Sequence, residues 1–475
     1  MMVHKIQKSL RDSAALRWGA LIIVSITMLF GYFLTDIMAP LKGLLEGQLG
    51  WSSDEFGTFN SAYGWFNVFF FMLIIGGIIL DKIGVRLTGL MSSIIMVAGA
   101  AIKYWAVSTN SLDGQTIWGI NSQVMIASIG FAIFAVGIEV AGITVSKIIY
   151  KWFKGKELAL AMGLQMAMAR IGTAVALSAS VPIARATGII DVSRPVLIGL
   201  IGLCIGLIVF IVYMVMDKKL DESEGITSST VVAPEDQFKI KDILTIITNR
   251  GWWYIAILCV LFYSAVFPFL KFGADLMVNK FGVSESLAGT IPALLPFGNI
   301  LLTPLFGTIY DRKGKGASIM IIGSILLILV HTLFAIPLLN NWIIAIVLIL
   351  ILGVGFSLVP SAMWPSVTKI IPERQLGTAY ALIFWVQNWG LMGVPKLIGW
   401  VLDKYCITGQ VVRDGLTVNT YDYTIPMMIF AGFGVLALVF AFLLKAEDKK
   451  KGYGLELPNI QPLKEIVVES EIREK

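Results

Sequence analysis

The sequence predicts an all-α integral membrane protein with twelve transmembrane helices in two pseudo-symmetric six-helix bundles. The 475 residues are 57% hydrophobic and only 14% charged. Because a single water-soluble core stops growing near ~250–300 residues, it cannot bury this surplus. Twelve apolar stretches reach the length of about 20 residues that crosses a bilayer. A short motif also recurs at equivalent places in the two halves of the chain. A soluble globular enzyme is therefore excluded.

The apolar stretches divide into two groups of six around one long polar segment. We expect a first bundle over 18–216, a linker over 217–250 and a second bundle over 251–444. The flanking segments, 1–17 and 445–475, are polar and short. The helices are expected at 18–39, 57–80, 87–107, 122–146, 157–183, 196–216, 251–273, 285–310, 316–337, 342–366, 374–401 and 424–444.

The distribution of positive charge predicts the topology. The net charge is +6, but the basic residues lie between apolar stretches and do not line one amphipathic face. This pattern excludes a nucleic-acid partner. Lys and Arg concentrate at the termini, in the linker and in the loops that share their side of the membrane. By the positive-inside rule, both termini are expected in the cytosol.

No motif in the sequence indicates catalysis or a cofactor. The three cysteines, Cys204, Cys259 and Cys406, form no C-x-x-C pair, so neither a metal site nor a disulfide framework is expected. The chain contains no Walker lysine loop, no H-E-x-x-H motif and no nucleophile elbow. Any energy for transport is therefore expected to come from solute or ion gradients.

The repeated motif has the form G-x-x-x-D-[KR]-x-G and follows the second and eighth predicted helices. Two copies in register indicate duplication of a six-helix unit. Its glycines allow close helix approach, its Asp can cap a neighbouring helix, and its basic residue can hold the loop at the cytosolic surface. Such a clasp is expected to stabilise the outward-facing state. The residues assigned to it are Gly77, Asp81, Lys82, Gly84 and Arg86, and then Gly307, Asp311, Arg312 and Gly314.

This doubled loop resembles that of the major facilitator superfamily, and further segments are similar to its lysosomal dipeptide transporter group, major facilitator superfamily domain-containing protein one. The similar segments are Trp152–Leu158, Gly163–Gln165, Met168–Gly172, Phe262–Phe269, Ala362–Pro365 and Pro372–Tyr380. The resemblance implies the major facilitator fold and a dipeptide substrate, with or without a basic side chain, moved by uniport or with protons. It also places the group's intramembrane Glu and Arg at Glu139 and Arg170. The chain departs from the group beside Glu139, where Ile138 replaces a Gly and Val140 replaces a Ser.

Three ionisable residues inside predicted helices are candidate ligands of a substrate. A charge at membrane depth costs ~2.5–3.5 kcal/mol on insertion scales, so Asp36, Glu139 and Arg170 are expected to face a cavity. Glu139 would bind an α-ammonium group, and Arg170 a carboxylate through its two-pronged guanidinium. Asp36 is assigned to a cationic side chain or to a proton. The alternative is a Glu139–Arg170 salt bridge that only ties two helices together.

Polar residues at helical spacing are candidates for the rest of the cavity wall. The alternative for each is an ordinary interhelical hydrogen bond. His331 is interpreted as a structural histidine in preference to a proton relay, and Lys396 as a side chain that reaches toward the extracellular interface. The polar candidates are Tyr63, Asn67, Tyr263, Trp364, Gln387 and Asn388, with Asn60, Ser357 and Ser361 on the same helix faces.

The function predicted is alternating-access transport of a small zwitterion, most simply a dipeptide, by a monomer in a lipid bilayer with protons as the candidate coupling ion. One alternative is a carrier of organic anions such as monocarboxylates that uses Arg170 alone. Another is a receptor or membrane enzyme that transports nothing. The resembled group is sorted to lysosomes by an acidic dileucine, which neither 1–17 nor 445–475 contains. A plasma membrane or bacterial inner membrane is therefore expected.

Overall fold

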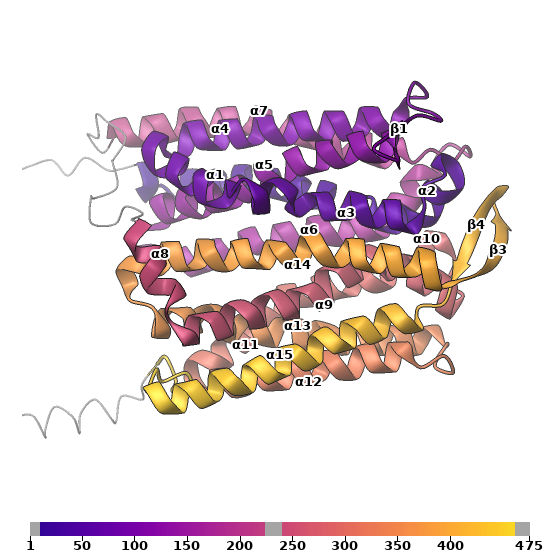
Figure 1. Cartoon of the computed structure of the whole chain (residues 1–475). Helices are drawn as coiled ribbons and strands as arrows, with labels where there is room; N and C mark the ends of the chain where they lie inside the picture. Colours follow the sequence, from indigo (N-terminus) through magenta and orange to yellow (C-terminus); the bar gives the residue numbers. More distant parts are fainter. Residues whose placement is uncertain (1–9, 224–239, 461–475) are drawn as a thin grey trace, which may run out of the picture.

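The computed structural model describes residues 10–223 and 240–460, and its long helices run side by side in two bundles (Figure 1). The N-terminal bundle contains α1 (Ala14–Asp36), α3 (Ser53–Phe69), α4 (Met72–Ser108), α5 (Ser122–Phe153), α6 (Leu158–Ala184) and α7 (Ser193–Ser223). The C-terminal bundle contains α9 (Arg250–Phe281), α11 (Thr290–Lys313), α12 (Gly316–Ala335), α13 (Trp342–Ile370), α14 (Leu376–Tyr405) and α15 (Thr424–Lys451). Much of the predicted 217–250 linker lies outside the described residues.

Short elements join the long helices at the two ends of the bundles. They are the helices α2 (Lys42–Leu49), α8 (Ile240–Ile247) and α10 (Glu285–Ala288), the 3-10 turns Leu10–Asp12, Ala39–Leu41 and Glu373–Gln375, and two antiparallel hairpins. One hairpin pairs β1 (Thr116–Ile117) with β2 (Ile120–Asn121), and the other pairs β3 (Ile407–Arg413) with β4 (Leu416–Tyr421). We call the end that carries β3–β4 the hairpin end, and the end that carries Leu10 and Ile460 the terminal end.

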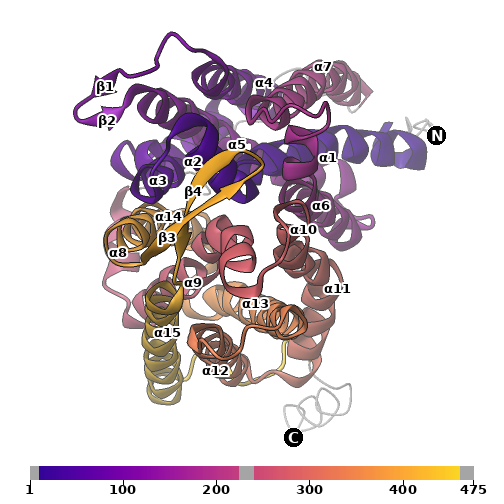
Figure 2. The same ribbon diagram turned by 90° about the vertical axis from the view of Figure 1, so that its right-hand side faces the viewer.

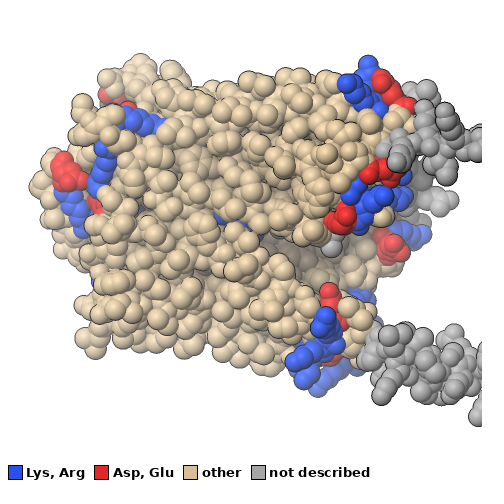
Figure 3. Space-filling model, turned by 180° about the vertical axis from the view of Figure 1, so that it is seen from behind, with Lys and Arg blue, Asp and Glu red and all other residues tan. Residues whose placement is uncertain are grey.

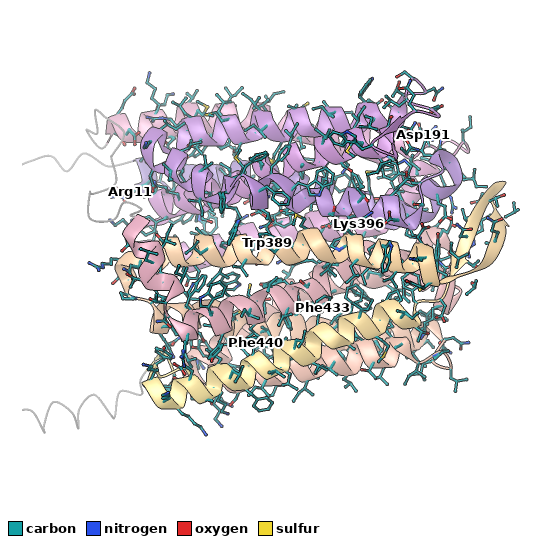
Figure 4. The ribbon with its side chains drawn as sticks, in the orientation of Figure 1. Arg11, Asp191, Trp389, Lys396, Phe433 and Phe440 are labelled. Atoms are coloured by element: carbon teal, nitrogen blue, oxygen red, sulfur yellow. The ribbon has the colours of Figure 1, made fainter. Side chains whose placement is uncertain are left out.

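The surface confirms the prediction of an all-α membrane protein. Ten helices of the described chain are long and apolar enough to cross a membrane. Figure 3 shows charged side chains gathered at the two ends, with an almost uncharged band between them. Figure 4 places Arg11 at the terminal end and Asp191 at the hairpin end. The band exposes large apolar side chains, as expected of a surface in contact with lipid.

The second predicted helix, 57–80, is broken in its middle. α3 ends at Phe69 and α4 begins at Met72, with Phe71 in the left-handed region at φ 52°. The same α4 then continues through a kink at Gly84, so that it also includes the predicted third helix. The break is closed by α14: Trp385 donates its indole N–H to the carbonyl of Val68 (3.0 Å) and stacks on Phe71. A neighbouring helix thus satisfies backbone that the break exposes, as membrane interiors require.

The two bundles touch through α3 against α14 and through α6 against α11. Glycines allow the closest approach at the hairpin end. A Cβ at Gly57 would lie 2.6 Å from the carbonyl oxygen of Pro395, and one at Gly289 would meet the carbonyl oxygen of Leu177 at 1.8 Å. Backbones therefore pack directly against each other there, as small residues permit in membranes.

Ion pairs reinforce this closure across the bundles. Lys396 was expected to reach toward the extracellular interface; its Nζ lies 2.6 Å from Asp54 and 2.8 Å from Thr58 Oγ1 of α3. In Figure 4 Lys396 lies where α14 faces the N-terminal bundle. Lys42 Nζ is 3.0 Å from Asp275, with both side chains less than a tenth exposed. Each pair joins the two bundles, so each must break if they separate at the hairpin end.

The β3–β4 hairpin crosses from the C-terminal bundle over the N-terminal one (Figure 2). Glu46 of α2 accepts hydrogen bonds from the backbone N–H of Asn419 (2.9 Å) and from the Tyr421 hydroxyl (3.0 Å). Burial, with the Glu46 carboxylate beside it, raises the pKa of Tyr421, so the hydroxyl stays a donor. At the turn, Arg185 of the N-terminal bundle pairs with Asp414. The hairpin therefore fastens the closed end.

At the terminal end the bundles diverge beyond the Phe71–Trp385 stack. The cavity between them has a volume of about 370 Å³, against about 110 Å³ for the central cavity described below. Figure 3 shows a hollow between the bundles at this end, seen from behind. The protein is thus open at the terminal end and closed at the hairpin end. The open cavity is lined by Leu73, Ile74, Gly77, Ile78, Leu80, Asp81, Ile143, Ser146, Arg374, Gly377, Thr378, Tyr380, Ala381 and Phe384.

The residues of the first repeated motif make contacts inside their own bundle. Asp81 accepts from Lys147 (2.8 Å), and Arg86 pairs with Asp221 (2.7 Å). Gly84 has φ 78° and forms the kink in α4, Gly77 lines the open cavity, and Lys82 is exposed. Because the bundles are apart here, the first copy does not clasp the opposite bundle in this state.

The second copy is covered by the segment that follows α15. Asn459 donates its amide N–H to Asp311 Oδ1 (2.8 Å), while a Cβ at Gly314 would meet the carbonyl of Glu456 at 2.5 Å. Arg312 is exposed, and Gly307 has open space beside it. Asp311 of the second copy therefore binds the segment that follows α15, and among the described residues it caps no neighbouring helix.

Candidate functional site

A cavity lies between the bundles, on the hairpin-end side of the broken helix. Six helices supply its walls: α1, α3, α5 and α6 from the N-terminal bundle, and α9 and α14 from the C-terminal bundle. Charged and aromatic side chains share it, an arrangement typical of small-molecule sites. The lining residues are Tyr32, Thr35, Asp36, Asn60, Tyr63, Glu139, Arg170, Thr173, Phe267, Pro268, Leu270, Lys271, Gln387, Leu391 and Pro395.

Glu139 and Arg170 both line this cavity, and they do not form a salt bridge with each other. Tyr63 donates its hydroxyl to Glu139 Oε1 at 2.7 Å. In the described part of the chain, Arg170 has no carboxylate partner; its guanidinium lies over the rings of Phe267 (5.9 Å) and Phe356 (5.7 Å). The alternative in which the pair only ties two helices together is therefore not realised in this state.

Asp36 also lines the cavity, but it is already paired. Its Oδ1 lies 2.6 Å from Nζ of Lys271, which also donates to the carbonyl of Thr35 at 2.8 Å. Both side chains are 12% exposed. Lys271 belongs to α9, so the pair joins the two bundles. Asp36 was assigned to a cationic side chain or a proton; in this state an intramolecular cation, Lys271, occupies it.

Sequence reasoning missed Lys271 and the neighbouring Lys103. Lys103 is fully buried in α4, donates to the carbonyl of Leu34 (3.0 Å) and lies 4.8 Å from the centre of the Phe131 ring. Both lysines lie inside strongly apolar stretches. The cost of a charge at membrane depth, already used for Glu139, could have singled them out.

The remaining predicted ligands fall into two groups. Gln387 lines the cavity and accepts a weak hydrogen bond from Cys259 (3.5 Å), and Asn60 and Tyr63 line it beside Glu139. Four other predicted ligands are absent from the lining: Asn67, Tyr263, Trp364 and Asn388. Asn67 and Asn388 each donate to a carbonyl four residues earlier in their own helix, and Trp364 donates to the Tyr263 hydroxyl (3.2 Å).

Two further candidates from the sequence serve helix packing. Ser357 donates to Asn299 (2.7 Å), and Ser361 donates to the carbonyl of Thr303 (3.1 Å), so both join α13 to α11. These are the ordinary interhelical hydrogen bonds of the alternative interpretation.

His331 lies outside the cavity lining. It is fully buried between the rings of Phe269 (5.2 Å) and Phe430 (5.3 Å). This apolar surrounding agrees with a structural histidine and offers no path for a proton relay.

A central cavity between two six-helix bundles, open at one end and closed at the other by contacts that can separate, is the architecture of an alternating-access transporter. A family model described as Major Facilitator Superfamily matches residues 16–395. The chain therefore belongs to the major facilitator superfamily, and it is a transporter, not an enzyme.

Its curated relatives include two proteins named lysosomal dipeptide transporter MFSD1. The zebrafish (Danio rerio) protein is 29% identical over 401 residues, covering 80% of each chain. The human (Homo sapiens) protein is 27% identical over 410 residues, covering 83% of this chain and 82% of its own. Among solved structures, an inward-facing, unoccupied bacterial homologue of the human lysosomal transporter Spinster superposes with a TM-score of 0.67. It is 13% identical, and the match covers 95% of this chain and all of that one.

Proposed function

We propose that this transporter carries small zwitterions, foremost dipeptides, and that the central cavity is their binding site. The observation that carries the proposal is a pair of opposite charges that lie apart in one cavity. Within residues 10–223 and 240–460, Arg170 has no carboxylate partner, and the hydrogen-bond partner of Glu139 is the Tyr63 hydroxyl. A substrate carboxylate can accept both prongs of the Arg170 guanidinium, while its ammonium group donates to Glu139. Charge-assisted hydrogen bonds of this kind are worth about 1.5–3 kcal/mol each.

The charge balance of the cavity supports a neutral substrate with separated charges. Asp36 and Glu139 are offset by Arg170 and Lys271, so a zwitterion adds no net charge to a site of low dielectric constant. The relatives whose names describe dipeptide transport support the same substrate class.

We infer a topology and a membrane from charge and composition. Residues 18–216 and 251–444 form the two moving halves, and the N-terminus (1–17), the linker (217–250) and the tail (445–475) lie in the cytosol. Under this orientation the described state opens to the cytosol. The chain works as a monomer in a plasma membrane or bacterial inner membrane, either as a uniporter or coupled to protons.

Uptake by the purified protein in liposomes tests the substrate class. We expect saturable uptake of alanyl-alanine and a loss of at least about tenfold in Glu139→Gln and in Arg170→Ala, the equivalent of about 1.4 kcal/mol. Glu157→Gln and Arg194→Ala are matched controls, because both residues form ion pairs at the ends of the N-terminal bundle, outside the cavity. Undiminished uptake in both cavity variants would refute the proposal.

A second candidate function, transport of organic anions, follows from the same free guanidinium of Arg170. It requires a carboxylate but no amine. Uptake of lactate that depends on Arg170 but not on Glu139 would favour it over dipeptide transport.

A further inference from the structure

The Asp36–Lys271 pair has no role in the zwitterion site as described, although it lies in the same cavity. With an Oδ1–Nζ distance of 2.6 Å, it is among the shortest ion pairs between the bundles. Asp36 is the last residue of α1, and Lys271 lies in α9 three residues after the helix-interior Pro268. The pair therefore lies inside the cavity that receives the substrate and is not a surface contact.

Both partners remain open to the cavity. Each side chain is 12% exposed, and both residues line the cavity together with Glu139 and Arg170. Lys271 has a long, flexible stem and a second acceptor, the carbonyl of Thr35 (2.8 Å), to which it can stay attached if Asp36 is taken by another cation. Lys103 lies close behind but donates to the carbonyl of Leu34 and is fully buried, so it cannot take over the role.

We propose that Lys271 is a specificity-determining residue: an internal cation that holds Asp36 until a charged substrate side chain displaces one member of the pair. The inference rests on the proposed dipeptide function. A cationic side chain replaces Lys271 on Asp36, and an anionic side chain replaces Asp36 on Lys271. A neutral side chain leaves the pair intact. The pair thereby lets one cavity accept dipeptides of either side-chain charge while the empty site stays neutral.

The proposal predicts opposite shifts in the two single variants. In Lys271→Met, Asp36 has no internal partner, so a cationic dipeptide no longer competes with a lysine. Its affinity relative to a neutral dipeptide should rise about tenfold, and that of an anionic dipeptide should fall. In Asp36→Asn, the free Lys271 should reverse both changes. The double variant should show little preference for either charge.

Competition in proteoliposomes measures these ratios. For each variant, one protein preparation is used to measure how strongly lysyl-alanine, glutamyl-alanine and unlabelled alanyl-alanine inhibit the uptake of labelled alanyl-alanine. Ratios of inhibition constants do not depend on how much protein folds. Lys396→Met is the matched control, because it removes a lysine of another pair between the bundles, outside the cavity lining, and should leave the ratios unchanged.

The outcomes separate this inference from the proposed function. Opposite shifts in Lys271→Met and Asp36→Asn support it. If the wild-type protein transports alanyl-alanine but the charge ratios stay within twofold in both variants, or move in the same direction, the pair only holds the bundles together and the inference is wrong. If the wild-type protein transports no dipeptide at all, the proposed function itself fails.

Discussion

The Lys42–Asp275 pair is one of the buried contacts that close the hairpin end, and removing its carboxylate should favour opening at that end. In Asp275→Asn, Lys42 keeps its charge but loses its partner at 3.0 Å, in a place where its side chain is 2% exposed. Breaking a buried pair from one side costs about 3–5 kcal/mol. When the bundles separate at this end, the pair is broken in any case. The substitution therefore penalises the closed state selectively.

Neighbouring groups reduce that penalty. The ring of Tyr421 lies 3.9 Å from Lys42 Nζ, and Glu46 lies at the same distance on the next turn of α2. We therefore expect about 1.5–3 kcal/mol, which shifts the equilibrium about 10- to 150-fold toward the state open at the hairpin end. The double variant Lys42→Met with Asp275→Asn removes both members of the pair, leaves Glu46 with its donors Asn419 and Tyr421, and should recover most of the shift.

Cysteine labelling measures the population. Ser53 is 1% exposed beneath the contact between α3 and α14, so a Ser53→Cys thiol reacts only when the hairpin end opens. In a background with Cys204, Cys259 and Cys406 replaced by Ala, a membrane-impermeant maleimide should label it at least about tenfold faster in Asp275→Asn. Asp191→Asn, which breaks a pair inside one bundle, is the control. Equal rates in the two variants would refute this account of the closure.

Three further substitutions test the site and the interface. Arg170→Lys keeps the charge but loses the two-pronged geometry, so the KM for alanyl-alanine should rise about 10-fold, and a wild-type KM would show that charge alone suffices. Tyr63→Phe removes the donor to Glu139 (2.7 Å), worth about 1 kcal/mol, and should weaken dipeptide binding about fivefold in the competition assay without affecting an N-acetylated analogue. Gly57→Val adds a side chain where even a Cβ would collide with the α14 backbone, so transport should be lost. Gly393→Val, with open space beside it, should retain transport. Similar uptake by the two variants would contradict the close packing.

The sequence predicts the fold class and most helix positions because a span's length and apolarity are local properties. The break at Phe70–Phe71 carries no such signal, since the segment is apolar and contains neither Gly nor Pro. It depends on Trp385, which is distant in sequence and closes the break from another helix. The β3–β4 hairpin did have a signal: Asp414-Gly415 between alternating apolar residues, with both residues at positive φ, is typical of a two-residue turn.

In the candidate site, too, the local properties of a helix could be predicted and the contacts between distant helices could not. Asp36, Glu139 and Arg170 could be selected because charge in an apolar helix is visible in the sequence. Which charges pair with each other depends on how the bundles meet, so the partnership of Asp36 with Lys271 could not be derived from α1 alone. Asn67 and Asn388 failed as cavity residues for a related reason: an amide in a helix can bond to its own backbone, and spacing does not reveal this.

The most direct test of the central claim combines one chemical change in the substrate with one change in the protein. N-acetylation removes the ammonium group that Glu139 is proposed to bind, and Glu139→Gln removes the carboxylate. For the wild-type protein in liposomes, alanyl-alanine should compete for uptake at least about tenfold better than its N-acetylated form. In Glu139→Gln this advantage should fall to about twofold or less, because the two changes remove the same interaction. An equal advantage in both proteins would contradict the claim that Glu139 recognises the substrate amine.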